Sequence, residues 1–187
     1  MADMETASPR RADPNRKQNI IDACLRVIAR RGVAGTSCRV VAAEAQVPLG
    51  SITYYFDGIQ DLLHQSFDQF ARQSVLAFAA RMKTATNAEE ACEAIATSIE
   101  RDVLNNPADL NINLEFYTLA ARDSSFRDIS DRWMSAVQKT MNRFFDAQTS
   151  VLLDAMIEGL TLHRALGGEP KSPKAIRDGI HRIAFQR

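Results

Sequence analysis

Apolar residues recur at helical spacing along most of the chain, and short polar or glycine-containing stretches separate these segments. The first segment runs from Asn15 to Arg31 and stops at Gly32, with arginines in its last turn, where cations complement the helix dipole. A stripe of apolar residues every three to four positions is typical of an amphipathic α-helix. Further segments of this kind cover residues 59–83, 87–104, 106–122, 126–145, 150–166 and 172–185. The pattern predicts an all-α protein.

The stretch from Thr36 to Phe56 predicts two short helices joined by a tight turn. In its first half, Val41 and Ala45 belong to one apolar stripe. Its second half opens with Pro48, which suits the first turn of a helix because the missing N–H would have had no partner there. Two helices joined in this way are typical of a helix-turn-helix, whose second helix fits the major groove of DNA.

The outward-facing side chains of the second short helix are candidates for contacts with DNA. Hydroxyl groups can bond base edges or phosphates, and apolar atoms can meet a thymine methyl group. Between Pro48 and Phe56 there is no Arg, Lys, Asn or Gln, so bidentate base readout would fall to Arg39, which could alternatively be a solvated surface charge. The expected DNA-binding residues are Arg16, Thr36, Ser37, Arg39, Pro48, Leu49, Gly50, Ser51, Thr53 and Tyr54.

This stretch also resembles the TetR family of bacterial transcriptional regulators, and the resemblance covers roughly residues 16 to 63. The residues that carry it are Thr36, Ala42, Val47, Tyr55, Phe56 and Leu62. It implies a three-helix N-terminal helix-turn-helix domain over residues 10–58. It also implies a helical ligand-binding and dimerisation domain over residues 59–187, in which the helix of residues 59–83 is the lever between ligand and DNA.

Two positions depart from the family pattern. The turn between the two short helices usually contains a glycine, and Gln46 stands there instead. Because glycine takes a positive φ freely and glutamine does not, we expect this turn to be strained or differently shaped. Ile59 stands where the family usually has a lysine that contacts a phosphate, so another basic residue would have to make that contact.

The distribution of charge supports a DNA-binding end. The chain has 187 residues and no net charge, but eight basic and only three acidic residues lie between Arg10 and Phe56. The remainder of the chain is therefore acidic, and a basic end on an acidic body is typical of a DNA-reading domain attached to something else. Residues 1–9 are small and polar, and we expect them to be a disordered tail.

The composition also bounds where the protein works. No apolar run approaches the roughly 18 residues of a membrane span, and the N-terminus lacks the apolar core of a signal peptide. Cys24, Cys38 and Cys92 form no CxxC pattern, so we interpret them as small hydrophobic residues in a reducing compartment, with redox sensing or metal binding as the alternative. These features predict a cytoplasmic protein that has no membrane partner.

Aromatic and methionine residues of the second half could line a cavity between helices, which is a usual site for a small molecule. The same pattern is also typical of an ordinary core. The candidate ligand-binding residues are Phe67, Phe78, Cys92, Phe116, Tyr117, Trp133 and Met134.

The last two predicted helices are candidates for a dimer interface. Gly159 lies in a helix interior, where it costs up to about 1 kcal/mol relative to alanine, and a close helix crossing would offset that cost. Two helices joined by a short loop can form half of a four-helix bundle with a second copy, or they can be an internal pair in a monomer. The candidate interface residues are Leu152, Met156, Gly159, Leu160, Ile176 and Ile180.

The segment between Phe145 and Leu152 contains neither glycine nor proline, although the family usually has a loop between two antiparallel helices here. A single helix from Phe126 to Leu166 would be about 60 Å long at 1.5 Å per residue. We therefore hypothesise that a flexible loop near Ala147 is absent from the sequence.

The resemblance implies a homodimeric repressor that binds a palindromic operator in double-stranded DNA and is released by a small, mostly apolar effector. The sequence contains no HExxH, GxSxG or GxGxxG motif, and its three histidines lie far apart, so we expect no enzyme activity, cofactor or metal site. Two alternatives stay open. One is a helical small-molecule-binding protein or enzyme without a DNA role, and the other is a regulator of the same fold that activates or that responds to a protein partner.

Overall fold

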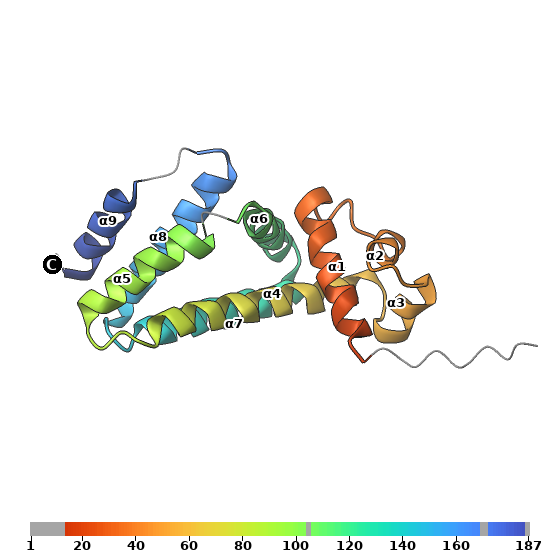
Figure 1. Cartoon of the computed structure of the whole chain (residues 1–187), viewed down its shortest axis with the longest axis horizontal. Helices are drawn as coiled ribbons and strands as arrows, with labels where there is room; N and C mark the ends of the chain where they lie inside the picture. Colours follow the sequence, from red (N-terminus) through yellow and green to blue (C-terminus); the bar gives the residue numbers. More distant parts are fainter. Residues whose placement is uncertain (1–13, 104–105, 169–171, 186–187) are drawn as a thin grey trace, which may run out of the picture.

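The computed structural model describes residues 14–103, 106–168 and 172–185, and this part of the chain contains helices and no strand, as predicted. Figure 1 shows α1–α3 at one end, α4 and α7 running side by side along the molecule, and α5 and α9 at the other end. The expected disordered tail of residues 1–9 and the first residues of the predicted DNA-binding domain, among them Arg10 and Arg11, lie outside the described residues. The helices are α1 (Arg16–Arg31), α2 (Cys38–Glu44), α3 (Leu49–Tyr55), α4 (Ile59–Met82), α5 (Ala88–Ser98), α6 (Pro107–Arg122), α7 (Arg127–Met141), α8 (Ala147–Ala165) and α9 (Pro173–Phe185).

Capping side chains fix the starts of the body helices. The side chain of Asn87 accepts a hydrogen bond from the backbone N–H of Glu90 at 2.9 Å, which starts α5 as the sequence predicts. Asn106 accepts from the N–H of Asp109 at 3.3 Å, and Pro107 occupies the first turn of α6. Each cap satisfies an N–H group that has no partner inside its helix.

The predicted helix over residues 87–104 changes its geometry near its end. It is α-helical to Ser98 and continues as the π-helical turn η1 (Ile99–Val103). A π-turn widens the helix by one residue and is frequent at functional sites. Ser98, Ile99 and Arg101 line a cavity that is described below.

The hypothesis of an absent loop near Ala147 is wrong. Residues 142–146 form a continuous turn between α7 and α8, with the N–H of Phe144 donating to the carbonyl of Met141 at 2.9 Å. Asp146 then caps α8 by accepting from the N–H of Thr149 at 2.8 Å. The turn needs no glycine or proline because Phe145 is anchored in the core and an aspartate supplies the new helix start.

Two hydrophobic clusters fill the molecule, and neither belongs to the N-terminal helices alone. The first cluster joins α1–α3 to α4, α6 and the start of α7, and the ring of Phe67 lies 5.2 Å from that of Phe116 between centroids. The second cluster lies between α4, α5, α7, α8 and α9. Trp133 packs against both clusters. A displacement of α4, α6 or α7 therefore reaches the packing of α1–α3.

The second cluster corrects two expected interface residues. Ile176 and Ile180 are 2% and 1% exposed and pack inside the chain, so their side chains are not available to a second copy. Met156 also serves the chain internally, because a Cβ added at Gly179 would lie 2.8 Å from the Met156 Cε atom. Packing of α9 on both α5 and α8 accounts for both observations.

The turn between α2 and α3 adopts the left-handed geometry that a glycine would favour. Gln46 has φ of 55°, and its N–H donates to the carbonyl of Ala43 at 3.2 Å. The N–H of Val47 donates to the carbonyl of Ala42 at 3.0 Å, which completes a Schellman motif. The departure from the family pattern therefore changes the residue but not the shape of the turn.

This geometry predicts that Gln46→Gly does not destabilise the protein. Relief of the left-handed strain, about 1 kcal/mol or more, offsets the added freedom of glycine in the unfolded chain, about 0.4–1 kcal/mol. Ala43→Gly, at an exposed helical position three residues earlier, should instead cost about 1 kcal/mol. Chemical denaturation of the two variants measures both effects, and equal losses of stability would contradict the strained turn.

Candidate functional site

One side of α3 is buried in the core and the opposite side is exposed. Ile52 is fully buried, and Phe56, which follows the helix, is 3% exposed. Tyr54 is 79% exposed and Leu49 is 43% exposed on the other side. The remaining predicted residues of this helix lie on or near that open side, with Pro48, Gly50 and Thr53 exposed and Ser51 half-buried. No heavy atom lies within 4 Å of a Cβ built at Gly50, so nothing in the described chain occupies that space.

Two hydroxyl-bearing residues precede α2, and Thr36 is buried while Ser37 is exposed. Thr36 is 8% exposed, and its hydroxyl donates to the carbonyl of Gly32 at 2.7 Å. Thr36 was expected to bind DNA, but in the structure its hydroxyl closes the turn after α1. Ser37 is exposed and caps α2 by accepting from the N–H of Val40 at 3.4 Å, so its own O–H can still donate to a phosphate.

The basic side chains of α1 and α2 also have two roles. Arg26 and Arg30 both bind the carboxylate of Glu44, and these hydrogen bonds hold the pKa of Glu44 below its usual range. Arg39 is exposed and Arg16, the first residue of α1, is half-buried. Lys17 was not among the predicted residues, and its ammonium lies 5.5 Å from the ring centroid of Phe56, next to the end of α3. Ile59 packs against the first cluster instead of facing outward as a charge would.

A cavity of about 400 Å³ lies among α4, α6, α7 and α8, and η1 closes one side of it. Phe70, Phe78 and Trp133 supply aromatic walls, and Phe70 meets Trp133 edge to face with centroids 5.7 Å apart. Its polar lining includes the side chains of Asp109, Asn113, Asp154 and Glu158. The cavity therefore combines aromatic surface with several carboxylates.

Neutral hydrogen-bond donors orient two of these carboxylates. The hydroxyl of Tyr117 donates to Glu158 Oε2 at 2.6 Å, and the amide of Gln138 donates to Asp154 Oδ2 at 3.1 Å. Burial raises the pKa of Asp154 and of Glu158, and it also raises the pKa of the Tyr117 phenol, which stays protonated as the donor.

The structure divides the seven predicted ligand-binding residues. Phe78 and Trp133 line the cavity, and Tyr117 lies behind it on Glu158. Phe67, Phe116 and Cys92 are each 1% exposed and belong to the packed clusters instead. Met134 does not line the cavity either, because its side chain is 41% exposed on the outside of α7.

The carboxylates of the cavity were missed by sequence reasoning, although a signal was present. Asp154, Glu158 and Thr161 recur at helical spacing within residues 151–162 of α8, which are otherwise apolar. A polar stripe on one side of a buried helix indicates a polar cavity or an internal network. The apolar residues of the same helix predicted a dimer interface, and its polar residues were not considered.

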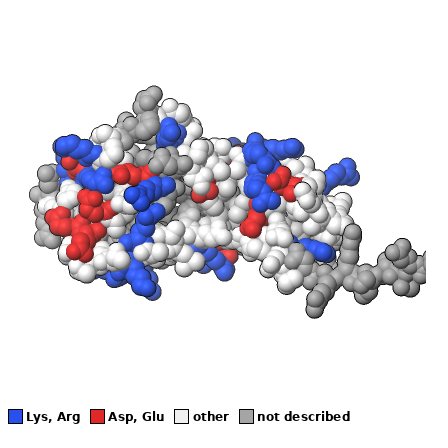
Figure 2. All heavy atoms as spheres, in the orientation of Figure 1, with Lys and Arg blue, Asp and Glu red and all other residues white. Residues whose placement is uncertain are grey.

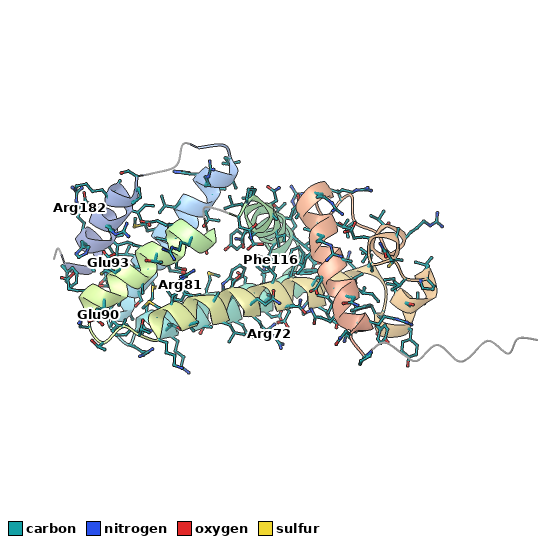
Figure 3. The ribbon with its side chains drawn as sticks, in the orientation of Figure 1. Arg72, Arg81, Glu90, Glu93, Phe116 and Arg182 are labelled. Atoms are coloured by element: carbon teal, nitrogen blue, oxygen red, sulfur yellow. The ribbon has the colours of Figure 1, made fainter. Side chains whose placement is uncertain are left out.

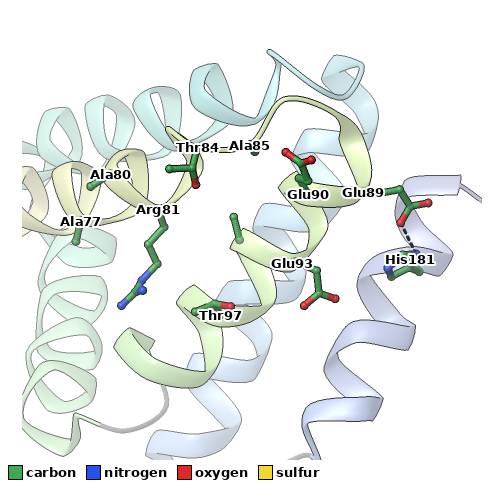
Figure 4. Close-up of a pocket in the computed structure, with 11 residues that line it drawn as sticks. Ala77, Ala80, Arg81, Thr84, Ala85, Glu89, Glu90, Glu93, Thr97 and His181 are labelled. Atoms are coloured by element: carbon green, nitrogen blue, oxygen red, sulfur yellow. Dashed lines mark ion pairs between the residues drawn. The ribbon is translucent and has the colours of Figure 1, made fainter.

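An open groove of about 960 Å³ lies between the end of α4 and α5, with Arg81 pointing toward it (Figure 4). Figure 2 shows acidic side chains gathered at this end of the molecule. Glu90 accepts from the N–H of Thr86 at 2.8 Å, Glu93 lies 3.0 Å from Arg177 Nε, and Glu89 lies 3.5 Å from His181 Nδ1. These acids already have partners, and the described residues of the lining include no Phe, Tyr or Trp, so the groove is the weaker candidate for a ligand site.

The helix α6 connects the cavity to the N-terminal helices. Near α1, Glu115 Oε2 accepts from the N–H of Val33 at 2.7 Å, and the Asn111 amide donates to the carbonyl of Ala29 at 3.1 Å. A Cβ added at Gly32 would lie 2.7 Å from Glu115 Oε1, and Gly32 has φ of 67°, so this position requires glycine. Figure 3 labels Phe116, which follows Glu115 in α6 and points into the first cluster.

One face of α8 is apolar and open. Its open stripe, here called the α8 stripe, consists of the half-buried Gly159 and the exposed residues Leu152, Ala155, Leu162 and Leu166. Leu152 and Leu162 are 50% and 44% exposed, and no heavy atom lies within 4 Å of a Cβ built at Gly159. The predicted residues Met156 and Leu160 are half-buried against the second cluster instead.

Other chemistry is sparse in the part of the chain that the structure describes. Within those residues no group of three or more His, Cys, Asp or Glu side chains could hold a metal ion, and no helix is long and apolar enough to cross a membrane. The three cysteines are free, and burial raises the pKa of the Cys24 and Cys92 thiols to about 11, which makes them poor nucleophiles.

Comparisons with known proteins agree on a family of regulators. The family described as "Bacterial regulatory proteins, tetR family" matches residues 20–65. The HTH-type transcriptional regulator BetI of Burkholderia mallei is 26% identical over 170 residues, which cover 86% of this chain and 87% of that protein.

Solved structures extend the likeness to the whole fold. A transcriptional regulator of Streptomyces coelicolor A3(2), SCO7518, is 39% identical with a TM-score of 0.85, over 92% of this chain and 100% of that one. The multidrug binding protein EbrR, solved in complex with ethidium, is 28% identical with a TM-score of 0.76, over 90% of this chain and 98% of that one. These relatives are regulators or binding proteins, which agrees with the expectation that the chain is not an enzyme.

Proposed function

Because this chain belongs to the TetR family of bacterial transcriptional regulators, we propose that it is a homodimeric repressor that a small organic effector releases from a palindromic operator. The observation that carries this proposal is the path through α6, which lines the cavity with Asp109 and Asn113 and holds the end of α1 with Glu115. DNA binding by the helix-turn-helix is the shared property of the family. The cytoplasm, where operator DNA is accessible, is the proposed location.

For DNA, we propose that α3 enters the major groove with Tyr54, Thr53 and Leu49 toward the bases. Their exposure supports this assignment, since side chains that meet DNA must be open in the free protein. Arg39 and Ser37 at the start of α2 would contact base edges or phosphates. Lys17, held beside Phe56, would supply the phosphate contact that Ile59 cannot make.

For assembly, we propose that the α8 stripe pairs with the same stripe of a second copy. Contiguous exposed apolar surface marks interaction sites, and Gly159 permits close approach of two helix backbones. A dimer would present two α3 helices, and recognition helices about 34 Å apart fit successive major grooves on one side of DNA. This spacing is the quantity that an effector would change.

For release, we propose that the effector binds in the cavity of about 400 Å³. The likeness to EbrR, solved with ethidium and with proflavin, supports a small organic molecule as the ligand class. A ligand that binds better to a conformation with another spacing of the α3 helices must weaken DNA binding. The change would travel along α6 to Val33 and along α4, which packs on α1.

The DNA assignment predicts that Arg39→Ala and Tyr54→Ala each weaken operator binding by about tenfold or more, because each removes a contact worth about 1–3 kcal/mol. The operator is first obtained by selection from random DNA, and affinity is then measured by fluorescence anisotropy at several salt concentrations. Arg182→Ala is the control, because it also removes one positive charge but lies at the far end of the molecule (Figure 3). Wild-type affinity in both test variants would remove Arg39 and Tyr54 from the site. A wild-type protein without salt-dependent DNA binding would favour a ligand-binding role without DNA.

The dimer assignment predicts that Gly159→Leu raises the dimer dissociation constant by about tenfold or more. The new side chain meets open space within its own chain and improves helix propensity by about 0.8 kcal/mol, so the fold itself should persist. Ser135→Leu, which adds a leucine at an exposed position of α7, is the control. Sedimentation analysis distinguishes the outcomes, and a monomeric wild type or an undisturbed Gly159→Leu dimer would refute the α8 interface.

A further inference from the structure

We infer that the cavity among α4, α6, α7 and α8 selects an organic cation with aromatic or other apolar substituents. The inference deepens the proposed function, because the molecule that fills this cavity would be the effector. It narrows the mostly apolar effector that the sequence suggests, since a purely apolar molecule would leave buried carboxylates without a partner.

The first step is the charge of the lining. Asp109, Asp154 and Glu158 face the cavity from α6 and α8, and Arg101 of η1 is the single basic residue among the described lining residues. None of the three carboxylates forms an ion pair with a described basic residue. Other carboxylates of this protein do have such partners, including Asp68 with Arg132 at 2.9 Å. The cavity therefore holds a surplus of negative charge.

The second step is the burial of that charge. Asp154 is 7% exposed, and the only hydrogen bond that it receives from a described residue comes from the neutral amide of Gln138. Glu158, one helical turn further along α8, receives its hydrogen bond from the neutral hydroxyl of Tyr117. Neutral donors orient a carboxylate without cancelling its charge, and a buried carboxylate without a counter-ion is costly. A bound cation would supply the missing counter-ion.

The third step is the aromatic surface on the other walls. Phe70 and Phe78 come from α4 and Trp133 from α7, so the rings and the carboxylates lie on different helices around one space. A cation is attracted to the face of an aromatic ring, most strongly to tryptophan and more strongly where water is excluded. The amide oxygen of Asn113 in the same lining is buried and has no hydrogen-bond partner in the structure, so it offers a further acceptor.

Burial of the carboxylates also couples cation binding to their protonation. Burial raises the pKa values of Asp109, Asp154 and Glu158, whereas a bound cation would lower them by favouring the ionised carboxylates. Cation binding should therefore be weakened by protonation of these carboxyls, and affinity should rise as the pH rises through their raised pKa values. The charged and titratable groups that face or adjoin the cavity are Arg101 of η1, Asp109 and Tyr117 of α6, and Asp154 and Glu158 of α8.

The test uses two probes of nearly the same shape and opposite charge, tetraphenylphosphonium and tetraphenylborate. Isothermal titration calorimetry of the full chain without DNA should show tetraphenylphosphonium binding at least about tenfold more tightly, a difference of about 1.4 kcal/mol. Equal affinities, tighter binding of the borate, or no binding of either probe would overturn the inference.

Variants then assign the binding to the cavity. Glu158→Gln and Asp154→Asn keep the shape and a hydrogen-bond acceptor for Tyr117 or Gln138, and each should weaken phosphonium binding by about tenfold without weakening borate binding. Asp131→Asn, at an exposed position of α7, is the matched control and should bind as the wild type does. Thermal melts confirm that the variants are folded. Wild-type phosphonium affinity in both cavity variants would overturn the assignment of the carboxylates.

A parallel measurement of operator binding separates this inference from the proposed function. Selective phosphonium binding that leaves DNA affinity unchanged would support the cation site and contradict release by this cavity. Release of DNA by uncharged aromatic compounds, without preference for the phosphonium, would support the repressor and overturn the cation site.

Discussion

A carboxylate of α6 ties the N-terminal helices to the rest of the molecule, in addition to the hydrophobic cluster that they share with α4, α6 and α7. Glu115 of α6 accepts the N–H of Val33 just after α1, at a point where Gly32 leaves no side chain between the two elements. A hydrogen bond from a backbone N–H to a carboxylate is among the stronger ones, and the donor would be left unpaired if α6 moved away. The amide of Asn111 adds a second contact to α1 one turn earlier. The position of α2 and α3 therefore depends on where α6 lies.

In the proposed mechanism, the same helix connects the cavity to the DNA-binding helices. Asp109 and Asn113 lie on the cavity side of α6, while Asn111 and Glu115 lie on the side of α1, so a shift of the helix that accommodates a ligand also changes the junction. The shared core strengthens this link, because Trp133 packs against both hydrophobic clusters and also lines the cavity. Close-packed cores change between discrete arrangements more readily than they deform gradually. A ligand needs only a difference in affinity between two such arrangements to act at a distance.

Local chemistry made much of this fold predictable from the sequence. The stop at Gly32 and the apolar stripes identified the helices, and the combination of Thr36, Tyr55 and Phe56 identified the family. What escaped prediction depends on contacts between distant segments. Ile176 and Ile180 follow the same periodicity whether they face α5 or a second copy. Asp154 and Glu158 of α8 indicate a binding site only once the structure places aromatic rings around the same cavity. The reversal at residues 142–146 was missed because its anchor, Phe145, is a tertiary contact and not a turn residue.

The central claim is that occupancy of the cavity reaches the DNA through the hydrogen bond between Glu115 and Val33. The most direct test is the ratio of operator affinities without and with tetraphenylphosphonium, measured by anisotropy in the wild type and in Glu115→Ala at matched saturation with the ligand. The account predicts a ratio well above one in the wild type that falls toward one in Glu115→Ala, while the variant still binds the ligand. An equal ratio in the two proteins, or a ratio of one in the wild type, would contradict the account.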